Sequence, residues 1–111
     1  MDGKVKITTI AKLNDVFRQS FTGGRVMLTA GVNELEEVTK AKLLRQVQDF
    51  ATFNISNDPH AEHDFGSVKI EGQNYFWKID YYNLTLDGGS EDPANPTVTT
   101  RVLTIMRSDE Y

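Results

Sequence analysis

Residues 63–86, HDFGSVKIEGQNYFWKIDYYNLTL, carry the pattern that decides the fold. Apolar and polar residues alternate on both sides of Glu71-Gly72, which predicts a β-hairpin of residues 63–70 and 73–86 around a glycine turn. With Ile70 opposite Gln73, Gly66 should face Trp77 and His63 should face Asp80. The face expected to be buried carries Val68, Ile70, Tyr75, Trp77 and Ile79. The other face should stay half open and carries His63, Phe65, Phe76, Lys78, Asp80 and Tyr82.

Two helices are predicted before the hairpin. The first should begin at Thr8 or Thr9 and end at Gly23-Gly24, and residues 4–8 should form a short edge strand or remain loose. Its apolar face comprises Ile10, Leu13, Phe17 and Phe21. Asn33 and Glu36 resemble a capping box for a second helix, which should run to about Phe53. Its apolar face comprises Leu35, Leu43, Val47, Phe50 and Ala51.

Two more strands complete the predicted sheet. Residues 25–29 should form a short strand, and residues 98–106 should form a central strand because they are apolar on both faces. Residues 87–96 have the composition of a loop. The expected class is α+β, with two helices on one face of a mainly antiparallel sheet, in α-β-α-β-β-β order, ending in a three-stranded meander.

Length and composition bound the class of protein. The chain has 111 residues and no cysteine, so we expect one domain, residues 1–111, without disulfides or thiolate chemistry. Its start has no long apolar run, so we expect a soluble, cytoplasmic protein that does not act at a membrane.

The charge is unevenly distributed. Residues 54–95 contain two Lys/Arg and eight Asp/Glu, for a net charge of −6, whereas the whole chain carries −4. This distribution disfavours direct nucleic-acid binding and favours a protein partner with a basic surface. The chain could also pair with a second copy of itself.

The segment from Asp58 to Asp64 suggests two kinds of chemistry. A divalent metal could be held by Asp58, His60, Glu62 and His63, which would suit a small metal-dependent hydrolase or nuclease. Alternatively, His63 oriented by Asp80 could form a catalytic acid–base pair without a metal. The non-catalytic interpretations are a cross-strand ion pair of His63 with Asp80 and a solvated His60, and no nucleophile is indicated. We therefore expect no cofactor and more readily a binding protein than an enzyme.

A contact surface is the third interpretation. Aromatic side chains surrounded by charges are typical of protein interfaces, although the same rings could fill a second small core. The candidate binding residues are Phe65, Phe76, Lys78, Asp80, Tyr82, Asp87, Glu91 and Asp92, with Tyr81 as a further ring.

Five blocks of the sequence resemble a family of short bacterial proteins catalogued only as a domain of unknown function. They are FTGGRVMLT (21–29), NDPHAEHDFG (57–66), FWKIDYY (76–82), GSEDP (89–93) and RVLTIM (101–106). In that family's pattern position 61 is often glycine, so Ala61 is a small departure. The resemblance implies an accessory gene product, and hence an acidic inhibitor of a host defence enzyme, of the anti-CRISPR or anti-restriction type, that works by protein contact.

Overall fold

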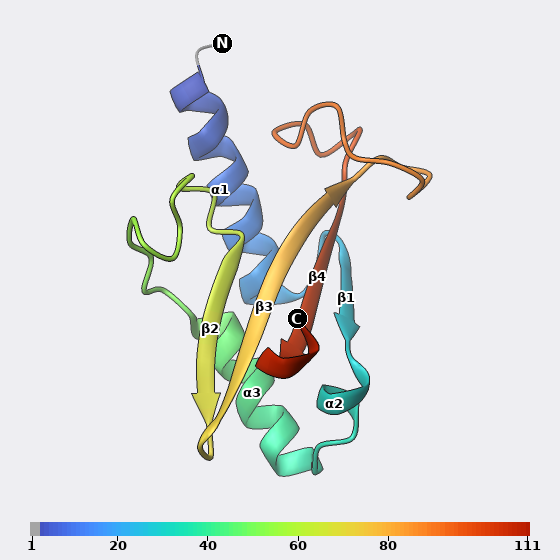
Figure 1. Ribbon diagram of the computed structural model, residues 1–111. Coiled ribbons are helices and arrows are strands. Elements are labelled where there is room, and N and C mark those ends of the chain that lie inside the picture. Colours follow the sequence, from blue (N-terminus) through green and yellow to red (C-terminus); the bar gives the residue numbers. More distant parts are fainter. Residues whose placement is uncertain (1–2) are drawn as a thin grey trace.

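The computed structural model describes residues 3–111 and is built around a four-stranded mixed sheet (Figure 1). Its strand order is β1-β4-β3-β2. β2, β3 and β4 are antiparallel neighbours, and β1 joins the sheet parallel to β4. The predicted α+β class is therefore confirmed. The strands are β1 (Arg25–Leu28), β2 (Phe65–Ile70), β3 (Gln73–Tyr82) and β4 (Thr100–Arg107).

The hairpin of β2 and β3 has the predicted register. Ile70 lies opposite Gln73, and Gly66 lies opposite Trp77. Glu71 and Gly72 both have positive φ, at 51° and 83°, as a two-residue turn that follows the right-handed twist of the strands requires. The alternation of the sequence thus fixes which face of the hairpin is buried.

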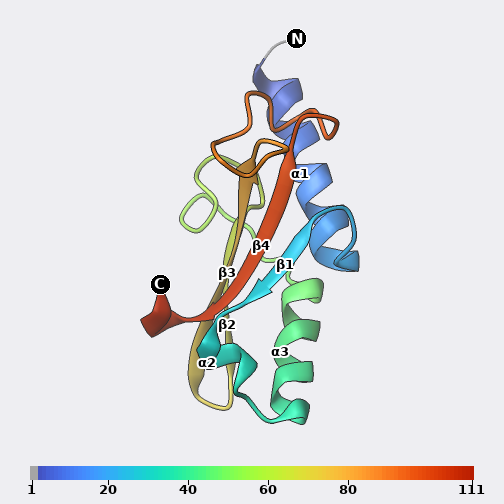
Figure 2. The ribbon, with the colours of Figure 1, turned by 90° about the vertical axis from the view of Figure 1, so that its right-hand side faces the viewer.

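The C-terminal turn lies on the side of the sheet opposite the two long helices (Figure 2). α1 and α3 run along the same face, where they contact each other. Between β1 and α3 the chain makes one more short helix. The bounds are α1 (Gly3–Ser20), α2 (Ala30–Asn33), α3 (Glu37–Asp49) and the 3-10 helix η1 (Ser108–Glu110). Among residues 3–111, no helix combines the length and apolar character needed to cross a bilayer.

The start of the first helix differs from the prediction. Residues 4–8 are helical rather than extended, and α1 begins at Gly3. The Thr8 and Thr9 hydroxyls donate to the carbonyls of Lys4 and Val5, four residues back, at 3.0 Å each. These threonines therefore lie inside the helix, where such back-bonding satisfies them, and do not cap its end.

The predicted second helix divides into two. Asn33 ends α2 and Glu36 precedes α3 without a side-chain capping bond, so the predicted capping box is wrong. The extra turn of α2 buries Val32 completely. α3 ends at Asp49, before the predicted Phe53, and the chain then becomes extended at Phe50.

The core lies between the sheet and the helices. Fully buried side chains come from α3 and from the covered face of the sheet: Leu43, Val47, Trp77, Leu103 and Ile105. Beyond the end of α3, Phe50 and Phe53 present their rings edge-on to Trp77, with centroid separations of 5.4 and 6.2 Å. Packing on Trp77 explains why both phenylalanines leave the helix that their spacing predicted.

Candidate functional site

Asn14 is the centre of a buried polar network beneath α1. Its amide nitrogen donates to the Glu62 backbone carbonyl at 2.9 Å and to the Tyr81 hydroxyl at 2.8 Å. Its amide oxygen accepts from Nε of Arg101 at 2.8 Å. Both Asn14 and Arg101 are buried. One amide therefore joins α1, β3, β4 and the segment before β2.

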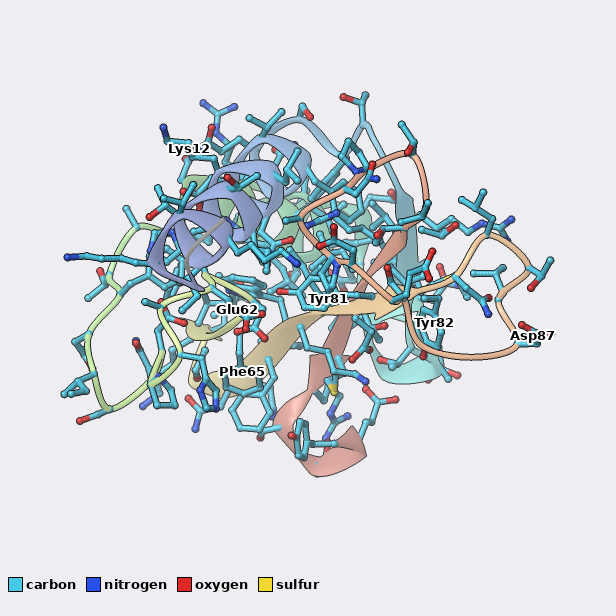
Figure 3. The ribbon with its side chains drawn as sticks, turned by 90° about the horizontal axis from the view of Figure 1, so that it is seen from above. Lys12, Glu62, Phe65, Tyr81, Tyr82 and Asp87 are labelled. Atoms are coloured by element: carbon cyan, nitrogen blue, oxygen red, sulfur yellow. The ribbon has the colours of Figure 1, made fainter. Side chains whose placement is uncertain are left out.

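Tyr81 and Glu62 close this network (Figure 3). The Tyr81 hydroxyl donates to Oε1 of Glu62 at 2.7 Å. Burial, followed by this hydrogen bond, raises the pKa of Tyr81. The Arg101 guanidinium lies 5.2 Å from the Tyr81 ring centroid, and burial lowers the pKa of Arg101. The Tyr81 side chain therefore lies on the helix-covered face of the sheet and does not contribute to the candidate contact surface.

His63 pairs with α1 and not with β3. Its Nδ1 lies 3.0 Å from both carboxylate oxygens of Asp15, and its Nε2 lies 3.7 Å from Oδ2 of Asp58. Its ring stacks on Phe53 at a centroid distance of 4.0 Å. Asp80 instead accepts from Lys78 at 2.7 Å. The predicted pairing of His63 with Asp80 is therefore wrong.

The backbone before β2 explains this change of partner. Ala61 and His63 both have φ of 56°, a left-handed conformation that interrupts the strand and redirects the His63 side chain. The Asp58 carboxylate holds this turn because it accepts from the backbone N–H groups of Glu62 and His63 at 3.1 and 3.2 Å. The regular ladder consequently begins only at Phe65.

A second buried cation, Arg18, lies on α1. Its guanidinium donates to Asp15 and to the backbone carbonyl of Phe50, both at 2.9 Å, and it lies over the Trp77 ring. Its Nε is buried without a hydrogen-bond partner. Asp15 therefore lies between Arg18 and His63, and the bond to Phe50 helps to end α3.

The four candidate metal ligands have other roles or positions. The Asp58 carboxylate accepts hydrogen bonds from backbone N–H groups, and the Glu62 carboxylate accepts one from the Tyr81 hydroxyl. His60 is exposed. Within residues 3–111, no three His, Asp or Glu side chains are grouped so that they could hold a metal ion. In the structure, Asp58 and Glu62 instead accept hydrogen bonds from other groups of the protein.

The side of the sheet away from α1 carries a cluster of rings. Phe65 and Phe76 lie 5.3 Å apart between centroids, and Tyr111 presents its ring edge to each, at 6.0 and 5.5 Å. Figure 3 shows Phe65 on the side of β3 opposite α1. The hydrogen bond to Asp80 raises the pKa of Lys78 beside this cluster. The structure thus brings together the predicted rings of β2 and β3 and adds Tyr111.

The same face is hollowed at its other end. A depression of about 290 Å³ is lined by Arg25, Met27, Tyr82, Leu86 and Val102. Met27 is 54% exposed, which is high for a methionine on a sheet. We call the ring cluster and this depression together the open face.

The acidic loop after β3 borders the open face at the Tyr82 end (Figure 3). Asp87 is exposed, and hydrogen bonds from Thr85 and Asn83 lower its pKa, so this carboxylate stays charged in mild acid. Glu91 is also exposed, whereas Asp92 is partly neutralised by Lys6 at 3.3 Å. Asp87 and Glu91 are therefore the free charges of the loop.

Sequence reasoning did not identify the buried polar residues Asn14, Arg18 and Arg101. One signal was present: Asn14 and Arg18 follow Ile10 at intervals of four, so a helix places all three on one face. Polar residues on a core-facing stripe require buried partners, and those partners lie far away in the sequence.

These features define an α+β domain with two helices on one side of a mixed sheet, a buried polar network under them and a ring-bearing face left open. The chain belongs to the family described as "Protein of unknown function (DUF3768)", whose model matches residues 28–110. The resemblance to a family of unknown function is therefore confirmed. The match begins at the end of β1, so α1 lies outside it. No curated protein and no solved structure matches the chain.

Asp64 provides a test of the electrostatics near the network. Burial, and then the charge of Glu62, raises its pKa above the ordinary 3.8. The folded state therefore binds this proton more tightly than the unfolded state, so the resulting stability is present in acid and is lost as the pH rises through the raised pKa. We expect Asp64→Asn to raise the melting temperature at pH 7 and to lose this advantage near pH 3.5. Thermal melts at both pH values, with Glu91→Gln as an exposed control, measure the effect; a lower melting temperature at pH 7 contradicts it.

Proposed function

We propose that the protein is a non-enzymatic protein-binding module and that the open face is its contact surface. The observation that carries this proposal is the one-sided arrangement of the sheet: α1 and α3 lie on one face (Figure 2), and the other face carries half-buried and exposed rings. Aromatic side chains are enriched among the residues that dominate binding energy at protein interfaces. The Lys78–Asp80 pair supplies polar groups beside the rings.

Charge indicates the kind of partner. Residues 54–95 carry −6, and Asp87 and Glu91 place exposed carboxylates at the border of the open face. A partner with a basic surface would be attracted to this border, and salt would screen the attraction. In its specific form, the proposal is an inhibitor of a nucleic-acid-processing defence enzyme of the host, of the anti-CRISPR or anti-restriction type. The acidic loop would occupy the enzyme's basic groove, and the protein itself would not bind nucleic acid.

Charge reversal in the loop tests the proposed electrostatics. We expect the double variant Asp87→Lys, Glu91→Lys to bind the partner at least ten times more weakly than the wild type at low salt, with a smaller difference at high salt. The partner is first isolated on immobilised wild-type protein at low salt, and its affinity is then measured by surface plasmon resonance. Glu37→Lys on α3 is the matched control because Glu37 is exposed on the helix side. Equal weakening by the control, or none by the loop variant, contradicts the proposed border.

A further inference from the structure

A second hollow lies on the helix side of the molecule, away from the open face. It is an open depression of about 510 Å³ formed by α1 and the segment before β2, and this volume is within the range of small-molecule sites. The helix contributes residues at intervals of three and four, which places them on one face. The lining comprises Lys4, Ile7, Thr8, Ala11, Lys12, Asp15, Ala61 and His63.

The middle of this hollow is apolar. Ala11 and Ala61 supply methyl groups, and Ile7 is 38% exposed, although the same helix buries Ile10 and Phe17 against the core. Thr8 also lines the hollow, and its hydroxyl is satisfied by the Lys4 carbonyl at 3.0 Å. The surface between the two lysines is thus suited to an aliphatic chain.

The lysines give the hollow a positive border. Within residues 3–111, neither Lys4 nor Lys12 has an acidic side chain at ion-pair distance, whereas Lys6 on the same helix pairs with Asp92 at 3.3 Å. Figure 3 shows Lys12 on the outer side of α1. Lysines that have no acidic partner in the described part of the chain, beside an apolar hollow, favour a ligand that carries both a negative charge and an apolar body.

The remaining carboxylate of the hollow is neutralised. Asp15 accepts from Arg18 at 2.9 Å and lies 3.0 Å from Nδ1 of His63. Its negative charge is thus paired with the Arg18 guanidinium, which weakens its repulsion of an anion near Lys12. The left-handed turns at Ala61 and His63, held by Asp58, keep the imidazole in this position.

We propose that this hollow binds an aliphatic monocarboxylate, with its carboxylate at Lys12 and its chain along Ile7 and Ala11 towards Lys4. A single negative charge fits because the lysines are eight residues apart, about 12 Å along the helix, so one head group reaches only one of them. A phosphate would require several convergent donors, which the lining does not supply. His63 is a positioning residue in this site because it acts through Asp15.

Decanoate, used below its micelle-forming concentration, is the probe, and decanol is its uncharged counterpart. In ¹H–¹⁵N spectra we expect decanoate to produce saturable shifts at Ala11, Ala61 and His63, and decanol to bind at least five times more weakly. Isothermal titration calorimetry should show that Lys12→Gln weakens decanoate binding at least threefold. His63→Gln should weaken it similarly because it removes the Nδ1 contact that positions the Asp15 carboxylate, whereas Lys6→Gln should change nothing.

Three results would overturn the proposal: no saturable shift at these residues, equal affinity for decanol, or equal weakening by Lys6→Gln and Lys12→Gln. Lys12 is exposed, so Lys12→Gln keeps the test decisive even where His63→Gln lowers stability. Phe76→Ser on the open face should leave decanoate binding unchanged. The outcome is therefore independent of the protein-binding proposal.

Discussion

Asn14→Ala is expected to lower the free energy of unfolding by about 4 kcal/mol. Alanine removes the two bonds that the amide donates, to Glu62 and Tyr81, and the one that it accepts from Arg101. Arg101 is 3% exposed, so its Nε would be left buried without an acceptor. Urea unfolding followed by circular dichroism measures the loss.

A double-mutant cycle separates the network from simple loss of packing. Arg101→Met removes the cation that Asn14 satisfies, so adding Asn14→Ala to it should cost clearly less than Asn14→Ala alone. Gln19→Ala, at an exposed position of the same helix, should change stability by less than about 0.5 kcal/mol. Additive effects of the two network variants would show that Asn14 and Arg101 act separately.

Gly66→Ala is expected to lower the free energy of unfolding by about 3 kcal/mol because of steric overlap. A β-carbon at this position would lie 2.4 Å from Nε1 and 2.6 Å from Cε2 of Trp77. Trp77 is completely buried beneath the helices, and Phe50 and Phe53 lie against its ring, so it has no free space to enter. The change should also alter the near-ultraviolet circular dichroism of the tryptophan.

Gly89→Ala is the matched control for this substitution. The nearest atom to a β-carbon at Gly89 is the Tyr81 carbonyl oxygen at 3.9 Å, an ordinary contact. We expect a change of less than about 0.5 kcal/mol for this variant. If Gly66→Ala unfolds at the same urea concentration as the wild type, the close packing of β2 on Trp77 is contradicted.

The hairpin could be predicted from the sequence because its information is local. A period of two and one glycine turn determine the register, and both can be counted along the chain. The parallel pairing of β1 with β4 is different, because no short-range pattern links Arg25 to Val102. The end of α3 also depends on distant residues, because Phe50 binds Arg18 through its backbone carbonyl and packs its ring against Trp77.

In the candidate site, too, the local features could be predicted and the long-range contacts could not. Phe65, Phe76 and Lys78 were predicted on one face because strand alternation places them there. The partners of His63 could not be predicted, because two left-handed residues turn its side chain towards α1, where Asp15 lies 48 positions earlier in the sequence. Neither position is glycine in this chain, so its composition gives no signal for the turn, although the glycine common at position 61 of the family pattern suits the left-handed φ of Ala61.

We propose that the open face, and not the helix side, binds a protein partner. The most direct measurement is quantitative mass spectrometry of proteins retained from a host lysate at low salt by three immobilised forms: wild type, Phe76→Ser and Val38→Ser. Val38 is 68% exposed on α3 and serves as the matched apolar position. We expect one partner to be retained by wild type and by Val38→Ser and to be lost with Phe76→Ser. Equal retention by all three folded forms, or loss only with Val38→Ser, would contradict it.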